Sequence, residues 1–176
     1  FIVDETDENY IILVEECLHN TQKGCLARLT VTKNDCKLVK NETILDLPTH
    51  LSFPNIIQVN GQTYMYPENG KAGNTKLYKY GKNLELCGKL LDLPLADATI
   101  FKYGDSFYMF FTIGENCNGN MLQIYRSNQP LSGYIFHQEI EFDDNIARRA
   151  GNVFIWKGHL ISPAQVCNHN YGEGAV

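Results

Sequence analysis

Residues 53–68, with the sequence FPNIIQVNGQTYMYPE, decide the fold because two apolar runs flank the dipeptide Asn60-Gly61. Asn-Gly between alternating hydrophobic residues is the strongest short-range signal for a β-hairpin, since a type I′ turn needs positive φ at both central positions. Residues 97–112 (DATIFKYGDSFYMFFT) and 150–165 (AGNVFIWKGHLISPAQ) have the same form. The three stretches therefore predict three equivalent hairpins.

Each hairpin belongs to a longer unit that recurs along the chain. Residues 1–15 form a fourth copy, with a chemically poor turn near Asp7-Glu8. A third and a fourth short apolar run follow the first three hairpins, at 25–31 and 37–40, at 75–80 and 86–91, and at 121–126 and 134–140. The turns are spaced by 53, 44 and 53 residues, counted between their second residues Glu8, Gly61, Asp105 and Gly158.

Four short strands that recur at this spacing are typical of the blades of a β-propeller. We therefore expect an all-β propeller with very little helix, and with units at about residues 1–46, 50–92, 96–142 and 149–176. An antiparallel sandwich is the alternative, because it also has many short strands, although it does not require self-similarity. Closing a ring takes at least about four blades, so we expect these three and a half units to be an incomplete piece of a larger propeller.

The composition argues against several functional classes. Fifteen Lys and Arg against 20 Asp and Glu give a net charge of −5, without the basic stripe that a nucleic-acid groove needs. No apolar run approaches the roughly 18 residues of a membrane helix, and residues 1–20 carry acids where a signal peptide would carry Lys or Arg. We expect a soluble protein, with a slight preference for the cytoplasm, and neither a metal nor a cofactor. The six cysteines form no C-x-x-C pair and are expected to be free, buried thiols.

The hairpin geometry predicts where the polar residues meet. In a two-residue hairpin, residues equally far from the turn face each other. Counted seven residues out from each turn, the expected partners are Phe53–Glu68, Asp97–Thr112 and Ala150–Gln165, and in the first copy the count reaches Glu15. These positions are expected to ring one mouth of the central channel.

The residues at this predicted mouth are the candidate site. Asp97 is a carboxylate in an apolar run, and burying it unpaired would cost several kcal/mol, so it needs a partner or a function. One of the adjacent Arg148 and Arg149 is expected to face the carboxylates, because the guanidinium fork suits them; Arg149 is our candidate. The whole set is Asp97 and Glu68 as catalytic candidates, and His50, Ser52, Arg149, Gln165 and Glu15 as binding candidates. The other histidines, His19, His137, His159 and His169, show no metal-ligand spacing and are expected on the surface.

Such a mouth suits a sugar. Carboxylates and amides bind hydroxyl groups, and the aromatic residues Phe53, Tyr66 and Phe111 nearby could pack on the apolar face of a pyranose ring. Two carboxylates on opposite sides of a glycosidic bond are also what its hydrolysis requires.

Several motifs in order resemble a known domain. They are HLSFP at 50–54, YMYPE at 64–68, ADATIF at 96–101, RAG at 149–151 and PAQ at 163–165, followed by Tyr171-Gly172. They resemble the N-terminal propeller domain of glucosamine inositolphosphorylceramide transferases and of related bacterial proteins of glycan assembly. That domain is similar to the five-bladed propellers of glycoside hydrolase family 43. The resemblance spans nearly the whole chain and implies a five-bladed propeller.

The resemblance also implies functional residues. By position, Asp97 matches an Asp on the third blade of the hydrolases, whereas their base Asp would precede Phe1. Their acid Glu has no clear match, because Gln165 stands at the equivalent strand end and Glu173 is the remaining candidate. In the transferases a separate C-terminal domain carries the transfer chemistry.

We therefore expect a carbohydrate-binding accessory domain of a glycosyltransferase-associated protein. Its ligand would be a glycan, and its partner a fused or separate glycosyltransferase domain. Two alternatives stay open: a family 43-type glycosidase and a protein-interaction propeller. The protein-interaction alternative is disfavoured because the chain lacks the Trp-Asp mark of the WD40 class.

Overall fold

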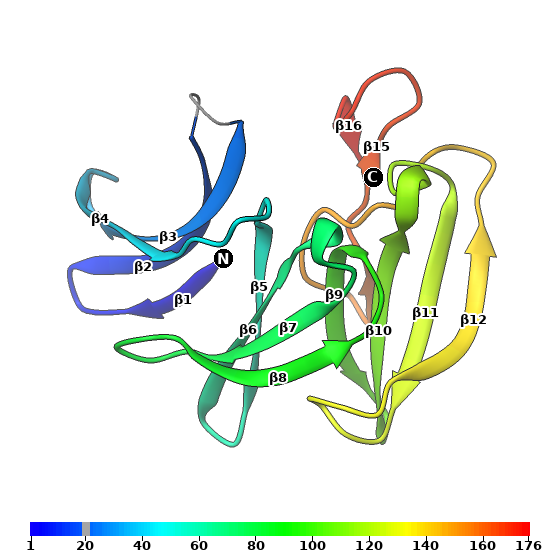
Figure 1. Ribbon diagram of the computed structural model, residues 1–176, viewed down its shortest axis with the longest axis horizontal. Helices are drawn as coiled ribbons and strands as arrows, with labels where there is room; N and C mark the ends of the chain where they lie inside the picture. The colour runs from blue at the N-terminus through cyan, green and yellow to red at the C-terminus, as the bar shows by residue number, and fades with distance from the viewer. Residues whose placement is uncertain (19–21) are drawn as a thin grey trace.

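The computed structural model describes residues 1–18 and 22–176, which form mostly antiparallel β-sheet (Figure 1). Three sheets have four strands each, in sequence order. The first contains β1 (Ile2–Glu5), β2 (Asn9–Leu18), β3 (Lys23–Thr32) and β4 (Leu38–Leu45). The second contains β5 (Ser52–Val59), β6 (Gln62–Glu68), β7 (Thr75–Lys79) and β8 (Glu85–Leu91). The third contains β9 (Leu95–Tyr103), β10 (Ser106–Ile113), β11 (Met121–Ser127) and β12 (Ile135–Glu141).

Shorter elements complete the described chain. Two hairpins follow the third sheet, formed by β13 (Phe154–Trp156) with β14 (His159–Ile161), and by β15 (Gln165–Val166) with β16 (Gly174–Ala175). Two one-turn 3₁₀ helices, η1 (Gly70–Ala72) and η2 (Gly114–Asn116), follow β6 and β10. This confirms the predicted all-β class. In the part of the chain that is described, neither helix has the length and apolar character needed to cross a bilayer.

The predicted hairpin turns are present. Val59 pairs with Gln62 across Asn60-Gly61, whose φ angles of 51° and 76° are both positive, as a type I′ turn requires. Lys157-Gly158 has φ angles of 49° and 80° at the tip of the β13–β14 hairpin. Turn chemistry that is visible in the sequence thus sets the local fold.

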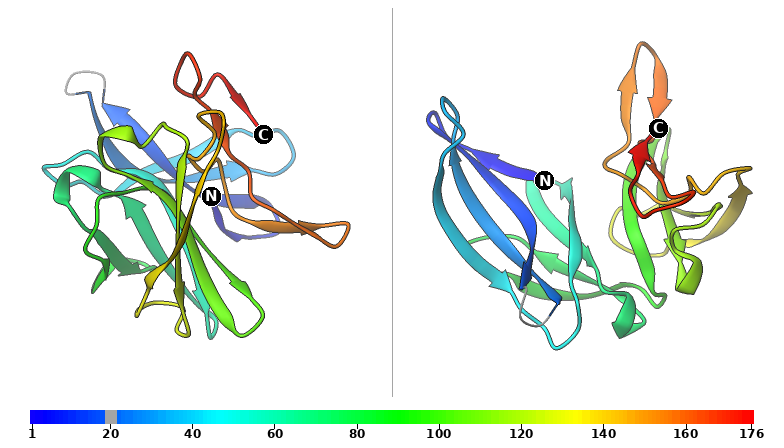
Figure 2. Two further views of the ribbon diagram at one scale, coloured as in Figure 1. Left: turned by 90° about the vertical axis from the view of Figure 1, so that its right-hand side faces the viewer. Right: turned by 90° about the horizontal axis from the view of Figure 1, so that it is seen from above.

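The second sheet is covered on both faces. Successive residues of a strand point to opposite faces, and in β6 Met65 packs in one cluster with Leu13 of the first sheet. Tyr66, the next residue, packs in another cluster with Phe111 of the third sheet. A two-layered sandwich covers each sheet on one face only, whereas these sheets follow one another along an arc (Figure 2).

The first strand of each sheet lies toward the inside of this arc. Contacts between the sheets run mainly through β5 and β9. The first six residues of β9 are buried, whereas most of β12, the last strand of the same sheet, is exposed. Residues near the start of β5 and β9 are therefore presented to a shared interior.

The predicted pairing is wrong at the inner end of the second sheet. Glu68 pairs with Ser52 and not with Phe53, because the register shifts between β5 and β6. A β-bulge inserts one extra residue into one strand, and Phe53 has a φ of 42°, in the left-handed region. Counting residues from the turn assumes an unbroken ladder and cannot detect this insertion.

The residue pairs predicted at the inner ends of the third and fourth hairpins are also wrong. Thr112 pairs with Ala96, because the register shifts next to Asp97, whose φ is 46°. In the fourth copy a bridge joins Arg149 to Ala164, in place of the predicted Ala150–Gln165 pair. The shift therefore recurs at one end of successive hairpins.

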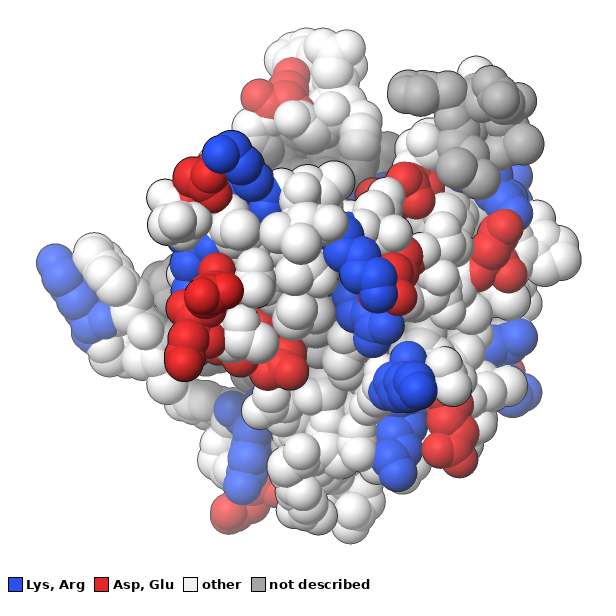
Figure 3. Space-filling model, turned by 90° about the vertical axis from the view of Figure 1, so that its left-hand side faces the viewer, with Lys and Arg blue, Asp and Glu red and all other residues white. Residues whose placement is uncertain are grey.

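The surface of the first sheet carries charges of both signs. Figure 3 shows this face, on which Lys and Arg alternate with Asp and Glu. Several are paired, including Lys33 with Glu5 at 2.9 Å and Lys40 with Glu42 at 2.9 Å. This face therefore does not offer the basic stripe that nucleic acids need.

The cysteines are free thiols, but only part of the prediction that they are buried is correct. Cys25 and Cys167 are buried and Cys117 is half-buried, whereas the exposed ones are Cys17, Cys36 and Cys87. Cys87 is exposed because it lies on the outermost strand of the second sheet. His137, His159 and His169 are exposed as expected, and His19 lies outside the described residues.

Candidate functional site

Asp97 occupies the bulge of β9 and is only 3% exposed. Left-handed backbone costs an ordinary residue roughly 1–2 kcal/mol, and Asp and Asn tolerate it best after Gly. The Asp97 N–H donates to Oε2 of Glu68 at the end of β6, at 3.0 Å. The two candidate carboxylates therefore meet where neighbouring sheets come together.

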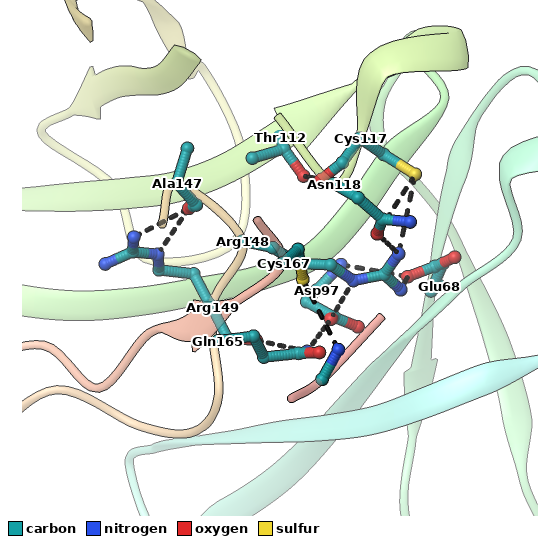
Figure 4. A network of polar contacts seen from close by, with 11 residues as sticks. Glu68, Asp97, Thr112, Cys117, Asn118, Ala147, Arg148, Arg149, Gln165 and Cys167 are labelled. Carbon is teal, nitrogen blue, oxygen red and sulfur yellow. Dashed lines mark hydrogen bonds and ion pairs between the residues drawn. The ribbon is translucent and has the colours of Figure 1, made fainter. Parts of the chain in front are cut away.

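Arg148 binds both carboxylates (Figure 4). Its Nε donates to Oδ2 of Asp97 at 2.6 Å, and its Nη2 lies 3.3 Å from Oε2 of Glu68. Its Nη1 donates to Oδ1 of Asn118 at 2.7 Å. Both ion pairs are largely buried, so removing one partner would leave an uncompensated charge.

Gln165 and Tyr171 complete the surroundings of Arg148. Nε2 of Gln165 donates to Oδ2 of Asp97 at 2.9 Å and to the carbonyl oxygen of Arg149 at 3.0 Å. The guanidinium of Arg148 lies 5.1 Å from the centre of the Tyr171 ring, within the range of a cation–π contact. The guanidinium of Arg148 is thus held from four parts of the chain: β6, β9, the loop after β10 and the β15–β16 turn.

The electrostatics of this cluster favour a protonated Glu68. Burial raises the pKa of Glu68 to about 7, the charge of Asp97 adds to this, and Arg148 opposes it. Burial alone would lower the pKa of Arg148, but its hydrogen bond to Asp97 and the charges of both carboxylates raise it overall. Near neutral pH, Arg148 therefore stays a cation, while Glu68 can give or take a proton.

A second polar pair lies beside this cluster. Nδ1 of His50 accepts a hydrogen bond from the N–H of Gly24 at 2.9 Å, so a neutral His50 carries its proton on Nε2. Nε2 lies 3.3 Å from Oε1 of Glu15 on β2. The backbone of the first sheet therefore sets the orientation of a side chain that precedes the second.

These residues surround a hollow of about 490 Å³, which we call the mouth cavity. Pockets of roughly 300–1,000 Å³ are the usual size for small ligands. Its walls are formed by Glu15, His50, Ser52, Phe53, Glu68, Asp97, Asn118, Arg148, Gln165 and Tyr171. The structure thus brings together six of the eight predicted residues: Glu15, His50, Ser52, Glu68, Asp97 and Gln165.

The prediction that Arg149 faces the carboxylates is wrong. Neighbouring residues of an extended segment point in opposite directions, and Arg149 turns away from Asp97. Its Nε donates to the carbonyl oxygen of Ala147 at 2.9 Å, and its Nη1 donates to Oγ of Ser162 at 2.9 Å. Burial lowers the pKa of Arg149 to about 10. Its contacts hold the local chain, and Arg148 takes the expected place.

Glu173 also lies outside the mouth cavity. Its Oε1 accepts hydrogen bonds from the N–H groups of Asn168 and His169, at 2.9 and 3.2 Å, within the β15–β16 turn. Glu173 therefore holds the turn that carries Tyr171. Two of the aromatic residues expected near a sugar are also inaccessible, because Tyr66 is 1% exposed and Phe111 is 0% exposed.

Sequence reasoning missed Asn118 and Tyr171. Asn118 lies in the Asn- and Gly-rich loop 114–120 directly after β10, so its place at a strand end was a usable signal. Tyr171 lies in a loop between two very short strands, which no hydrophobic pattern marks, but Tyr171-Gly172 is among the motifs that carry the family resemblance, and that was a usable signal. In the described residues, no group of three His, Cys, Asp or Glu side chains could hold a metal ion.

The chain is similar in sequence to known plant proteins. The family described as "Glucosamine inositolphosphorylceramide transferase 1, N-terminal" matches residues 2–175. The chain is 33% identical over 141 residues to Glucosamine inositolphosphorylceramide transferase 1 of Arabidopsis thaliana. It is 32% identical over 139 residues to the protein of that name from Oryza sativa subsp. japonica. Each match covers 73% of this chain but only 18% and 19% of the relatives, so the chain spans about a fifth of their length.

Solved glycosidases share the fold. An exo-1,5-α-L-arabinanase from a bovine ruminal metagenomic library matches with a TM-score of 0.68 and 12% identity, over 98% of this chain and 70% of its own. A thermostable family-43 glycoside hydrolase matches with a TM-score of 0.63 and 14% identity, over 96% of this chain and 66% of its own. At this identity the likeness shows the fold alone. The sequence comparison confirms the resemblance in the motifs, and the chain belongs to the family of the glucosamine inositolphosphorylceramide transferase 1 N-terminal domain.

Proposed function

We propose that this chain is a carbohydrate-binding domain that accompanies a glycosyltransferase domain. In this proposal the three four-stranded sheets are successive blades of a five-bladed propeller, and β13 and β14 begin a fourth. The relatives named as transferases are about five times as long as the matched region, which leaves room for a separate catalytic domain. The role of this chain is then to hold a glycan.

The observation that carries the proposal is the chemistry of the mouth cavity. Carboxylate, amide and imidazole groups from three sheets and a hairpin converge there, and each can bind a sugar hydroxyl. Phe53 and Tyr171 also line the cavity and offer apolar rings. Arg148 and Asp97 neutralise each other, and the carboxyl groups of Glu15 and Glu68 then give the wall an acidic character. A neutral or amino sugar fits this charge better than an anionic one.

A family 43-type glycosidase is the second candidate, and one observation favours it. Glu68, with a pKa of about 7, could act as a general acid near neutral pH. Against it, Oδ2 of Asp97 is taken by Arg148 and Gln165, and the Asp97 side chain is only 4% exposed. A carboxylate that is bound in this way is poorly placed to activate a water molecule, so binding is the better supported function.

Glu15 and Glu16 provide a matched test of sugar binding. Glu15 lines the cavity, whereas Glu16 accepts a hydrogen bond from Asn41 at 2.9 Å outside it. We expect Glu15→Gln to weaken binding of glucosamine or galactose to the full-length protein about tenfold, because a charge-assisted hydrogen bond contributes about 1.5–3 kcal/mol. Glu16→Gln should bind like the wild type, as measured by calorimetric titration. Failure of both sugars to bind, or equal loss in both variants, would contradict the proposal.

The glycosidase candidate is tested separately by turnover of aryl glycosides. Hydrolysis by the wild-type protein that disappears in Asp97→Asn, with sugar binding retained, would favour the enzyme. Sugar binding without turnover of any aryl glycoside would favour the binding domain.

A further inference from the structure

A second hollow adjoins the mouth cavity. This side cavity has a volume of about 820 Å³, and its walls include His50, Glu68, Gly70, Lys71, Leu95 and Cys117. His50 and Glu68 line both hollows. The two cavities are therefore neighbours, with the Glu68 carboxyl and the His50 imidazole at their junction.

The two cavities differ in their chemistry. The mouth cavity is walled by the carboxylates, the amides and Arg148 described above. The side cavity combines apolar wall at Leu95, open backbone at Gly70 and one cation at Lys71. Each is within the size range of small-ligand pockets, about 300–1,000 Å³. A single sugar unit would occupy the mouth cavity, where the hydroxyl-binding groups gather, and leave the side cavity with Gly70 empty.

Glu68 has one oxygen directed to the protein and one left for a ligand. Its Oε2 accepts from the Asp97 N–H and faces Arg148. Its Oε1 accepts no hydrogen bond from any residue within 1–18 and 22–176 that the structure describes. The side chain is 16% exposed, so a ligand at the junction can reach it.

We propose that the site takes a glycan of at least two sugar units, with one unit in the mouth cavity, the next in the side cavity and their linkage beside Glu68 and His50. This inference rests on the proposed function and deepens it, because it names an oligosaccharide and not a single sugar as the ligand class. It also assigns the surface around Gly70 and Lys71 to binding.

Gly70 allows the side cavity to be filled without disturbing the fold. A Cβ atom built at Gly70 meets no atom within 4 Å, and Gly70 is exposed at the start of η1. Gly70→Trp should therefore block the side cavity and leave the mouth cavity open. Gly81→Trp is the matched control, because Gly81 is also exposed, its nearest neighbour to an added Cβ is 3.7 Å away, and it lines neither cavity.

The experiment measures affinity against chain length with the full-length protein. The probes are glucosamine with its β-linked dimer and trimer, and galactose with β-1,3-galactotriose, titrated by calorimetry. We expect an oligosaccharide to bind about tenfold or more tightly than its monosaccharide, equivalent to about 1.4 kcal/mol. Gly70→Trp should abolish this gain and leave monosaccharide affinity unchanged, while Gly81→Trp keeps both.

The outcomes separate this inference from the function on which it rests. Equal affinity for monosaccharide and oligosaccharide, or a gain that survives Gly70→Trp, overturns the two-cavity inference and leaves sugar binding intact. A loss of monosaccharide binding in Gly70→Trp also overturns it, because the cavities would then not be separate subsites. If none of the probes binds, both proposals are wrong.

Discussion

Glu68 lies between a buried aspartate and a buried arginine, and its proton depends on both. The ion pair with Arg148 favours the charged form, whereas burial and the charge of Asp97 favour the neutral form and prevail. The result is a carboxyl group with a pKa of about 7, far from the ordinary 4.5. Because this shift belongs to the folded state, it makes stability depend on pH.

We predict that Glu68→Gln removes part of the pH dependence of the free energy of unfolding. Between pH 4.5 and about 7 the folded protein holds a proton that the unfolded chain has lost. The contribution of Glu68 to the free energy of unfolding is therefore full below pH 4.5 and declines as pH rises to about 7, by up to about 1.4 kcal/mol per pH unit. Urea denaturation at several pH values measures it: the wild type should lose stability relative to Glu68→Gln across this window and not above it. Parallel profiles would show that the pKa of Glu68 is ordinary.

At the residue scale, the sequence predicted which residues belong to the site better than it predicted where their side chains point. Asp97 was found because a carboxylate in an apolar run needs a partner, and Glu68 was found because counting from the Asn60-Gly61 turn places it at the mouth. Arg148 and Arg149 are adjacent in the sequence, and only the three-dimensional path decides which of them faces Asp97. Tyr171 depends on the β15–β16 turn, which Glu173 holds through two backbone N–H groups, and no periodic pattern encodes that arrangement.

At the scale of elements, the close approach of β3 to the segment before β5 positions His50. The N–H of Gly24 donates to His50, and the carbonyl oxygen of Gly24 accepts from the N–H of Leu51 at 3.0 Å. A Cβ at Gly24 would lie 2.3 Å from the Leu51 carbonyl oxygen and 2.9 Å from Oε1 of Glu15. Only a glycine allows the two segments to come this close.

Gly24→Ala should therefore destabilise the protein and displace His50. Backbone must move to admit the methyl group, and overpacking of this kind costs typically about 1–3 kcal/mol. The free energy of unfolding measures the first effect, and the NMR signals of the His50 imidazole report the second. Gly70→Ala is the control, since its Cβ meets nothing within 4 Å, and it should stay within about 0.5 kcal/mol of the wild type. If both variants are equally stable, the close approach at Gly24 is not as the structure has it.

Elements were predictable where local chemistry decides them. Asn60-Gly61 and Lys157-Gly158 adopt the positive φ angles that their turn requires. The bulges at Phe53 and Asp97 were not predictable, because neither residue is a glycine and neither run of sequence is interrupted. A one-residue shift moves side chains to the other face of a strand, so the bulges changed which residues pair at the mouth without changing the architecture.

At the scale of the whole molecule, the four-stranded sheets pack against one another in the order of the chain, with a hydrophobic cluster between each neighbouring pair. One cluster joins the first sheet to the second through Leu13 and Met65, and another joins the second to the third through Tyr66 and Phe111. The repeating hairpins made this serial packing predictable, since self-similar units bury equivalent faces. The β13–β14 hairpin departs from the pattern because it forms a sheet of two strands, where the earlier units have four.

This hairpin should make the 176-residue chain associate with itself. Its side chains are unusually exposed for apolar residues, with Ile155 at 74%, Trp156 at 57% and Phe154 at 48%. A two-stranded sheet with free edges and an apolar surface recruits other strands, and a lysine on such an edge prevents this.

We expect Ile155→Lys to shift the chain toward monomer in sedimentation velocity. The fluorescence emission of Trp156, the only tryptophan, should change with protein concentration in the parent chain but not in the variant. Leu86→Lys replaces a residue that is 56% exposed on β8 of a four-stranded sheet and should leave association unchanged. A chain that stays monomeric at every concentration, or an equal effect of both substitutions, would show that the β13–β14 hairpin does not mediate self-association.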